Sequence, residues 1–168
     1  MRILAIDPGP TESAFVLWNG EVLINCGLLK NADMRSSLRN LEVEESDECA
    51  IETITSYGMA VGKEVFDTCI WIGVFLECWD RRSAQKTVLI PRSEIKLHHC
   101  HSAKAKDANI RQALIDKYGK PGTKKQRGLT YGLNGHLWSA FAIATYVAET
   151  THTADSPRMS TRKKEVTV

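Results

Sequence analysis

No stretch of the 168-residue sequence is apolar enough, over a sufficient length, to span a membrane, and its opening residues lack a signal-peptide pattern. We therefore expect a cytoplasmic protein with no membrane partner. The sequence also has no CxxC pair. Its five cysteines are odd in number and fall mostly in apolar segments, which favours reduced core thiols over disulfides or zinc ligation; they are Cys26, Cys49, Cys69, Cys78 and Cys100.

The length and composition are those of a single globular domain. With 168 residues, 43% of them hydrophobic, the chain can bury one sizeable core. We expect this domain to occupy residues 1–150. Residues 151–168 are rich in Thr, Ser, Lys and Arg, and we expect them to form a disordered basic tail.

Charge is distributed unevenly along the sequence. Residues 1–80 carry 5 basic and 14 acidic side chains, a formal charge of −9, whereas residues 81–128 carry 13 basic and 3 acidic side chains, a formal charge of +10. A basic block of this kind is typical of proteins that bind nucleic-acid phosphates, although a solvated face with no partner is the alternative. The acidic half favours the first interpretation, because a metal-dependent nuclease needs one region for cations and another for DNA.

Asp7 follows a short apolar run, residues 2–6, and precedes the chain-breaking pair Pro8-Gly9. A strand would therefore deliver its carboxylate into a turn, where backbone and water oxygens can complete the coordination of a cation. The alternative role for Asp7 is that of a cap or turn residue.

Glu52 is a second carboxylate of the same kind, inside the apolar segment CAIETIT of residues 49–55. An ionised carboxylate in a strand of this type is costly unless a cation compensates it. The alternative is a residue on the rim of a half-exposed strand. Taken together, two acids carried by strands predict a divalent-metal site for phosphoryl chemistry.

The order of the expected elements indicates the fold class. A strand over residues 2–6 precedes a hairpin over residues 14–29 that turns at Asn19-Gly20. The elements expected after it are a helix or loop over 31–42, the Glu52 strand, a long and largely buried helix over 61–82, a strand over 86–90 stopped by Pro91, an amphipathic helix over 108–118, and a buried Ala-rich helix over 137–150. This order predicts an α/β domain with a five-stranded mixed sheet and helices on both faces.

Three segments resemble the RuvC-type Holliday junction resolvases of the RNase H-like superfamily. They are IDPG at residues 6–9, AIE at 50–52 and HLWSAFAIA at 136–144. Residues 60–66 and 104–114 are similar to the phage-encoded branch of that family, which would place the protein in the cytoplasm of a bacterial host. The resemblance covers residues 1–149 and implies an RNase H-like fold.

The resemblance also implies an activity. It is that of a homodimeric endonuclease that nicks two opposed strands of a four-way DNA junction, with two Mg²⁺ or Mn²⁺ ions about 4 Å apart. Asp7 and Glu52 match the first two metal ligands, and His136 matches a ligand at the start of the last helix. Ser139 stands where the family commonly has a carboxylate, and a neutral hydroxyl is a poor ligand for magnesium. Asp107 is the candidate substitute ligand, or else the cap of the helix that follows it.

Four basic residues are candidates for contact with DNA. Lys96 and Lys106 resemble basic positions near the scissile phosphate, where an ammonium group offsets charge in the transition state, so Lys96 is also a candidate catalytic residue. Lys104 and Arg111 belong to the same basic block. Tyr57, in the loop after Glu52, either wedges into the junction by stacking on a base or is an ordinary loop aromatic.

His98, His99, Cys100 and His101 form a run of residue types that bind zinc. On a strand, adjacent side chains point in opposite directions, so we do not expect them to share a tetrahedral site.

Two other functions remain open. An ATP-using fold of the actin and sugar-kinase type also opens with an Asp-Gly-bearing hairpin, but it needs glycine-rich phosphate loops and a much longer chain. A branched-DNA-binding protein that has lost catalytic power through Ser139 is the second. Magnesium-dependent cleavage of a four-way junction distinguishes this binder from a nuclease.

Overall fold

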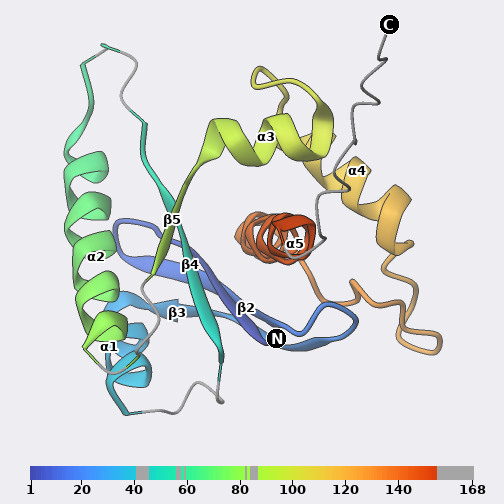
Figure 1. Ribbon diagram of the computed structural model, residues 1–168, viewed down its shortest axis with the longest axis horizontal. Helices are drawn as coiled ribbons and strands as arrows, with labels where there is room; N and C mark the ends of the chain where they lie inside the picture. Colours follow the sequence, from blue (N-terminus) through green and yellow to red (C-terminus); the bar gives the residue numbers. More distant parts are fainter. Residues whose placement is uncertain (41–45, 56–57, 59, 82, 84–86, 155–168) are drawn as a thin grey trace, which may run out of the picture.

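The computed structural model describes residues 1–40, 46–55, 58, 60–81, 83 and 87–154. Its elements, in chain order, are β1 (Ile3–Asp7), β2 (Glu12–Trp18), β3 (Leu23–Lys30), α1 (Asn31–Asn40), β4 (Glu48–Thr53), α2 (Lys63–Asp80), β5 (Val88–Pro91), α3 (Arg92–Cys100), α4 (Asp107–Tyr118) and α5 (His136–Ala154). The strands form one sheet in the order β3-β2-β1-β4-β5 (Figure 1). Strands β1, β2 and β3 pair antiparallel, while β4 pairs parallel with both β1 and β5. The predicted five-stranded mixed sheet is confirmed.

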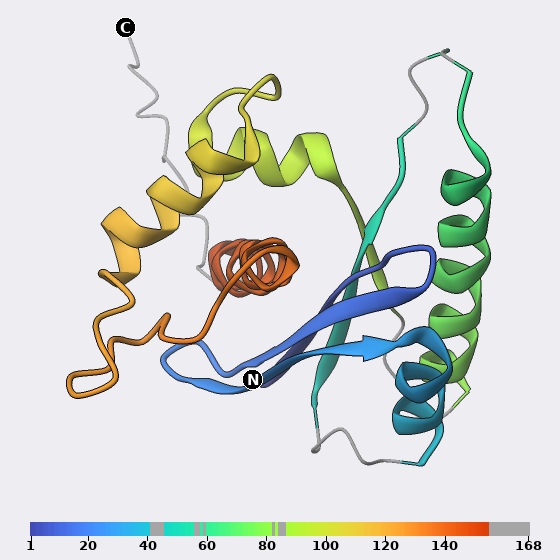
Figure 2. The ribbon, with the colours of Figure 1, turned by 180° about the vertical axis from the view of Figure 1, so that it is seen from behind.

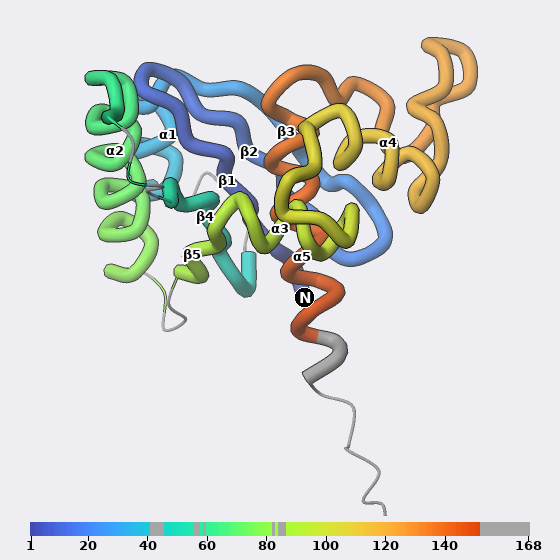
Figure 3. Tube along the Cα trace, turned by 90° about the horizontal axis from the view of Figure 1, so that it is seen from above, coloured from blue at the N-terminus to red at the C-terminus, as the bar shows by residue number. Residues whose placement is uncertain are grey.

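Helices cover both faces of this sheet, as predicted. Helix α5 lies across one face with α3 and α4 packed around it, and α1 and α2 cover the other face (Figures 1 and 2). Seen from above, α2 and α4 lie at opposite sides of the molecule (Figure 3). Each face has its own apolar cluster, because alternate side chains of β1 and β2 point to opposite sides of the sheet.

The cluster under α5 is built on aromatic contacts. Phe141 is fully buried, and its ring meets those of Trp18 and Tyr118 edge-on at centroid distances of 5.2 and 5.3 Å. The Ala-rich segment of α5 lets the helix approach β1 and β2 closely, so this helix is held firmly on the sheet.

The predicted hairpin is also confirmed. The Asn19 side-chain oxygen accepts hydrogen bonds from the backbone N–H groups of Glu21 and Val22, at 3.0 and 2.7 Å. Gly20 takes a positive φ of 98°, which a side chain would disfavour. These two residues turn the chain from β2 into β3.

The turn after Asp7 is fixed by buried polar groups. The Ser13 hydroxyl accepts from the Gly9 N–H at 3.3 Å and donates to the Asn31 side-chain oxygen at 2.7 Å, while the Asn31 amide donates to the Gly9 carbonyl at 2.9 Å. A Cβ atom on Gly9 would collide with the carbonyl oxygen of Glu12. The end of β1 is therefore anchored to the start of α1.

Helix α2 departs from its predicted burial and limits. It was expected over residues 61–82 as a largely buried helix, but it runs from Lys63 to Asp80, and 60% of Phe66 and 64% of Ile70 are exposed. Only one side of the helix, including Phe75 and Trp79, packs on the protein. The apolar spacing correctly predicts a helix. The helix lies in an outer layer, however, so its other side is exposed. Cys69, also on α2, is exposed rather than in the core.

Three other segments correct the sequence-based expectations. The residues around His98 form helix α3, not a strand. Asp107 is the first residue of α4 rather than its cap, and the flanking residue is Lys106. Helix α5 continues to Ala154, beyond the expected end at residue 150, and residues 155–168 of the expected tail lie outside the described residues. Within the described part of the chain, no helix combines the length and apolarity needed to span a membrane.

The packing of α5 leads to a stability prediction. Replacing Phe141 with Ala should lower the free energy of unfolding by about 3–5 kcal/mol. The change leaves a cavity in the core and removes the contacts of the Phe141 ring with three other aromatic rings. Urea unfolding followed by circular dichroism measures this loss. Leu97→Ala is the control, since that side chain on α3 is exposed and should cost about 0.5 kcal/mol or less. Equal losses in the two variants would contradict the assigned core.

Candidate active site

Two parallel strands bring the predicted acidic residues together. Ile6 of β1 pairs with Ile51 of β4, so Asp7 and Glu52 follow at the same edge of the sheet. Their side chains are only 12% and 17% exposed. The sequence-based expectation that Glu52 is carried by a short strand is correct, and the two carboxylates are neighbours because the carboxyl ends of parallel strands coincide.

A third parallel strand delivers an arginine to the same place. Thr53 pairs with Pro91 at the end of β5, and Arg92 follows as the first residue of α3. The guanidinium donates one hydrogen bond to Glu52 Oε2 at 2.7 Å, another to Asp107 Oδ1 at 2.7 Å and a longer one to Ser139 Oγ at 3.3 Å. Arg92 therefore links β4, α4 and α5 through one planar group.

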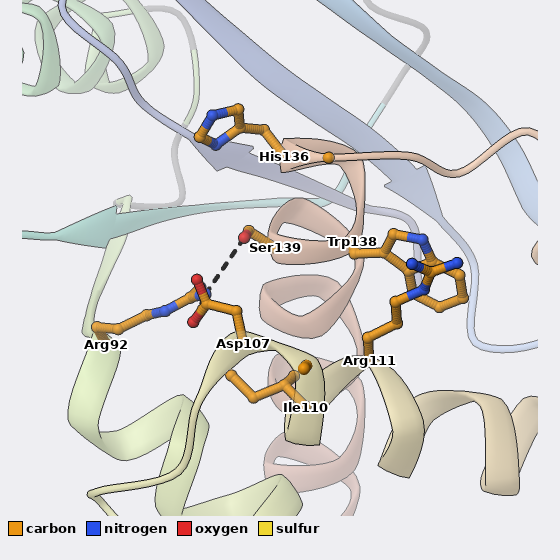
Figure 4. A pocket seen from close by; sticks show the side chains of 9 residues that line it. Arg92, Asp107, Ile110, Arg111, His136, Trp138 and Ser139 are labelled. Carbon is orange, nitrogen blue, oxygen red and sulfur yellow. Dashed lines mark hydrogen bonds and ion pairs between the residues drawn. The ribbon is translucent and has the colours of Figure 1, made fainter.

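Two further helices begin at this edge of the sheet. Asp107 opens α4 and His136 opens α5, whose next turn carries Ser139 (Figure 4). His136 donates from Nδ1 to Asp7 Oδ2 at 3.0 Å, and its side chain is 77% exposed. Because α3, α4 and α5 all start here, their positive N-terminal ends add to the field at the site, which favours bound anions.

The two buried acids hold their protons unusually well. Burial raises the pKa of Asp7, although the hydrogen bond and charge of His136, the charge of Arg92 and a hydrogen bond with Ser139 oppose this rise. Burial raises the pKa of Glu52 to about 7, and the charge of Arg92 lowers it while that of Asp7 raises it further. Asp107 behaves differently, because the hydrogen bond from Arg92 lowers its pKa.

The donor set at the site suits a hard divalent cation. Arg92 and His136 offset only part of the desolvation of Asp7 and Glu52, whose pKa values stay raised, and oxygen is the ligand that Mg²⁺ and Mn²⁺ prefer. Among the described residues, no three His, Cys, Asp or Glu side chains are grouped so that they could hold a metal ion. Arg92 lies between Glu52 and Asp107, so the guanidinium takes up Oδ1 of Asp107.

A cleft of about 430 Å³ adjoins these residues. His136, Ser139, Arg92 and Asp107 line one part of it, and Arg111 and Trp138 line another (Figure 4). The Arg111 guanidinium lies 5.3 Å from the Trp138 ring centroid. The cleft therefore runs from Asp107 and Arg92, the contact partner of Glu52, to Arg111 on α4.

The predicted DNA-binding residues lie near this cleft to different degrees. Arg111 lines it, and Lys96 is one turn after Arg92 on α3, close enough for its charge to lower the pKa of Asp107. Lys104 and Lys106 are exposed in the segment that leads into α4. Tyr57 lies outside the described residues.

Arg92 belongs to the site, although its sequence position identified it only as one of the cations of the basic block. Its position carried a usable signal, since Arg92 directly follows an apolar strand ending in Ile90-Pro91, as Asp7 directly follows another. The same rule that selected Asp7 would have selected Arg92.

The run of histidines has structural partners. His98 Nε2 lies 2.9 Å from Glu149 Oε2, and His99 Nε2 donates to the Ala142 carbonyl oxygen at 2.9 Å. Glu149 also accepts from Tyr118 at 2.8 Å and pairs with Lys117 at 2.7 Å. These contacts join α3 and α4 to α5. They therefore fix the relative positions of Arg92, Asp107 and His136, the first residues of these helices.

Comparison with known proteins supports the fold. No known family's sequence profile matches the chain, and no curated protein matches it. The structure of Thermus thermophilus RuvC in complex with a Holliday junction substrate is similar, with 14% identity and a TM-score of 0.70 over 92% of this chain and 96% of that one. A second structure of Thermus thermophilus RuvC gives 15% identity and a TM-score of 0.65, over 92% and 97% of the two chains. The chain thus has a RuvC-like, RNase H-like fold, as predicted.

The raised pKa of Glu52 generates a prediction about stability and pH. Because the folded protein binds this proton more tightly than the unfolded chain, its contribution is fully present below about pH 4.5 and is lost as pH rises through about 7. Each pKa unit is worth about 1.4 kcal/mol. The metal-free protein should therefore lose a few kcal/mol between about pH 5 and 8, and Glu52→Gln should flatten this dependence.

Urea unfolding in EDTA across this pH range measures the effect. Glu21→Gln, on the exposed turn between β2 and β3, is the control and should keep the wild-type profile. Asp7 contributes in the same direction, so some dependence should remain in Glu52→Gln. An identical profile in Glu52→Gln and the wild type would show that Glu52 does not hold its proton in the folded state.

Proposed function

We propose that this chain is a metal-dependent endonuclease that cleaves four-way DNA junctions, or other branched DNA, by paired nicking. Residues 1–150 would form the nuclease domain. The observation that carries the proposal is the pair of mostly buried carboxylates, Asp7 and Glu52, side by side at the carboxyl ends of β1 and β4. The fold shared with Thermus thermophilus RuvC, solved with a Holliday junction substrate, supports the choice of DNA substrate.

Asp7 and Glu52 would hold Mg²⁺ or Mn²⁺, with His136 as a further ligand. When bound, such an ion lowers the pKa of a water ligand and neutralises charge on the phosphate. His136 orients the Asp7 carboxylate through their 3.0 Å contact. Lys96 would approach the phosphate from the next turn of α3 and offset its developing charge.

The basic block supplies the surface for DNA. Lys96, Lys104, Lys106 and Arg111 lie on α3, on α4 and in the segment between them, next to the acidic site. Phosphates bound along this surface would leave one phosphodiester over Asp7 and Glu52. Counterion release makes such binding strongly dependent on salt.

One observation favours a second candidate function. Ser139 lies where the resemblance to the resolvases would place a carboxylate, and Arg92 engages one oxygen of Asp107. A protein with these two features would bind branched DNA and cut it weakly or not at all. The nuclease assay below decides between the two functions.

The nuclease function predicts separate effects on cleavage and binding. Asp7→Asn should reduce cleavage of a labelled four-way junction in Mg²⁺ to background, because one ligand charge is lost. Binding should stay equal or become tighter, because repulsion between the site and the phosphates falls. Cleavage is measured on a denaturing gel, and binding by gel shift in EDTA.

Asp33→Asn serves as the matched control, since Asp33 lies in the first turn of α1, in the helical layer on the other face of the sheet. It makes the same chemical change and should leave both measurements unaltered. Near-normal cleavage by Asp7→Asn would contradict the nuclease proposal. A wild-type protein that shifts the junction without cutting it in Mg²⁺ would establish the second function.

Paired nicking needs two active sites, so the proposal includes a homodimer. Helix α2 offers an apolar stripe for the contact, in which Phe66 and Ile70 lie one turn apart and are mostly exposed. Gly73 follows on the same side, where an added Cβ would meet no atom within 4 Å. A second copy could approach this small residue closely and cover the two large apolar side chains.

The dimer leads to a prediction about mass in solution. The double change Phe66→Glu and Ile70→Glu should give a monomer, because facing charges cannot be buried together in the contact. Size-exclusion chromatography with light scattering measures the mass. Val22→Glu, an exposed apolar residue beside the β2–β3 turn, is the control and should remain dimeric. A monomeric wild type would overturn this part of the proposal.

A further inference from the structure

The Arg92 guanidinium occupies the space among the carboxylates of the site. It contacts Glu52 and Asp107 directly, at 2.7 Å each. It also reaches Ser139 at 3.3 Å, and Ser139 lowers the pKa of Asp7. One cationic group thus contacts two of the three acids directly, and its charge lowers the pKa of the third.

We infer that Arg92 takes the place of a second divalent cation, so that each chain binds a single metal ion through Asp7 and Glu52. The inference rests on the proposed nuclease function and specifies its chemistry. A guanidinium remains charged at any physiological pH and cannot dissociate from the protein. Its planar N–H groups are arranged to hold two acceptors at once, as they do here with Glu52 and Asp107.

Charge balance supports a single ion. In the DNA-free protein the ionised carboxylates of Asp7, Glu52 and Asp107 would carry −3 and Arg92 carries +1. One divalent ion brings this sum to zero, whereas a second leaves an excess of +2 beside Asp7, Glu52 and Arg92, whose side chains are mostly buried. Unbalanced charge in such a site is unfavourable.

Ser139 is matched to Arg92. Its hydroxyl accepts an N–H from the guanidinium and lowers the pKa of Asp7 without adding charge. A carboxylate at this position would bring a fourth negative charge and require a further cation. The neutral residue on α5 and the fixed cation on α3 therefore compensate each other across the cleft (Figure 4).

In this arrangement the phosphodiester is hydrolysed in one displacement at phosphorus. A water molecule attacks phosphorus and loses a proton to solvent, and a new P–O bond forms. The P–O3′ bond breaks, and the 3′ oxygen leaves with the bonding electron pair and takes up a proton. Arg92 donates hydrogen bonds to the phosphate oxygens as their charge grows and transfers no proton.

Manganese binding to the DNA-free protein tests the inference. Titration calorimetry gives the number of Mn²⁺ ions per chain, and electron paramagnetic resonance distinguishes an isolated ion from two coupled ions about 4 Å apart. The wild type should bind one ion with an isolated spectrum. Ser139→Asp alone should also bind one, because the guanidinium still occupies the space among the carboxylates that a second ion would need. Arg92→Gln combined with Ser139→Asp should bind two ions with a coupled spectrum.

The matched control combines Arg111→Gln with Ser139→Asp. It makes the same change in charge in the same cleft, yet Arg111 lies against Trp138 rather than among the carboxylates, so the count should stay at one. Circular dichroism checks that each variant is folded. If the Arg92→Gln double variant does not fold, the number of Mn²⁺ ions bound by the wild type still tests the inference.

Two coupled ions in the wild type, no bound ion, or a single ion in the folded Arg92→Gln double variant would each overturn the inference. The cleavage assay is independent of this count. If the wild type cuts junctions and binds two coupled ions, the nuclease function holds and the role inferred for Arg92 is wrong. If it binds one ion but does not cut, only the nuclease function is wrong.

Discussion

Desolvation of two mostly buried carboxylates is the constraint around which the site is organised. Parallel pairing of β1 with β4 puts Asp7 next to Glu52, and the charge of Asp7 adds to the difficulty of ionising Glu52. The surroundings offset this with Arg92 and His136 and with the starts of three helices. These groups come from segments distant in the sequence, so the packing of α3, α4 and α5 against the sheet decides whether the acids are ionised.

The framework behind the site keeps these groups in place. The Gly9, Ser13 and Asn31 hydrogen bonds fix the turn after Asp7, and the Glu149 cluster joins α3, α4 and α5. Both networks lie away from the cleft. Each is built from polar side chains whose partners are supplied by another element, which makes their geometry specific. The site is therefore rigid where it contacts the sheet and open at His136 and Asp107, which are largely exposed.

Several features were predictable because they depend on short stretches of chain. The Asn19-Gly20 turn, the strands ending at Asp7 and near Glu52, and the helical spacing of α2 and α5 follow from local residue preferences and periodicity. The layer occupied by α2 did not follow, because apolar spacing shows a helix but not which of its sides is covered. The histidine segment was misread for a related reason, since no local signal placed His98 and His99 against α5.

The sequence by itself determined the five-stranded mixed sheet with helices on both faces and the delivery of Asp7 and Glu52 to strand ends, because side-chain periodicity and chain-breaking residues act locally. Only the tertiary structure decided which cation meets which acid. Arg92 and Asp107 are 15 residues apart, and Arg92 and Ser139 are 47 apart. Their contacts exist because β5 pairs parallel with β4 and because α4 and α5 begin at the same edge of the sheet. Long-range strand pairing and helix packing set such distances, and neither is encoded in the spacing of residues along the chain.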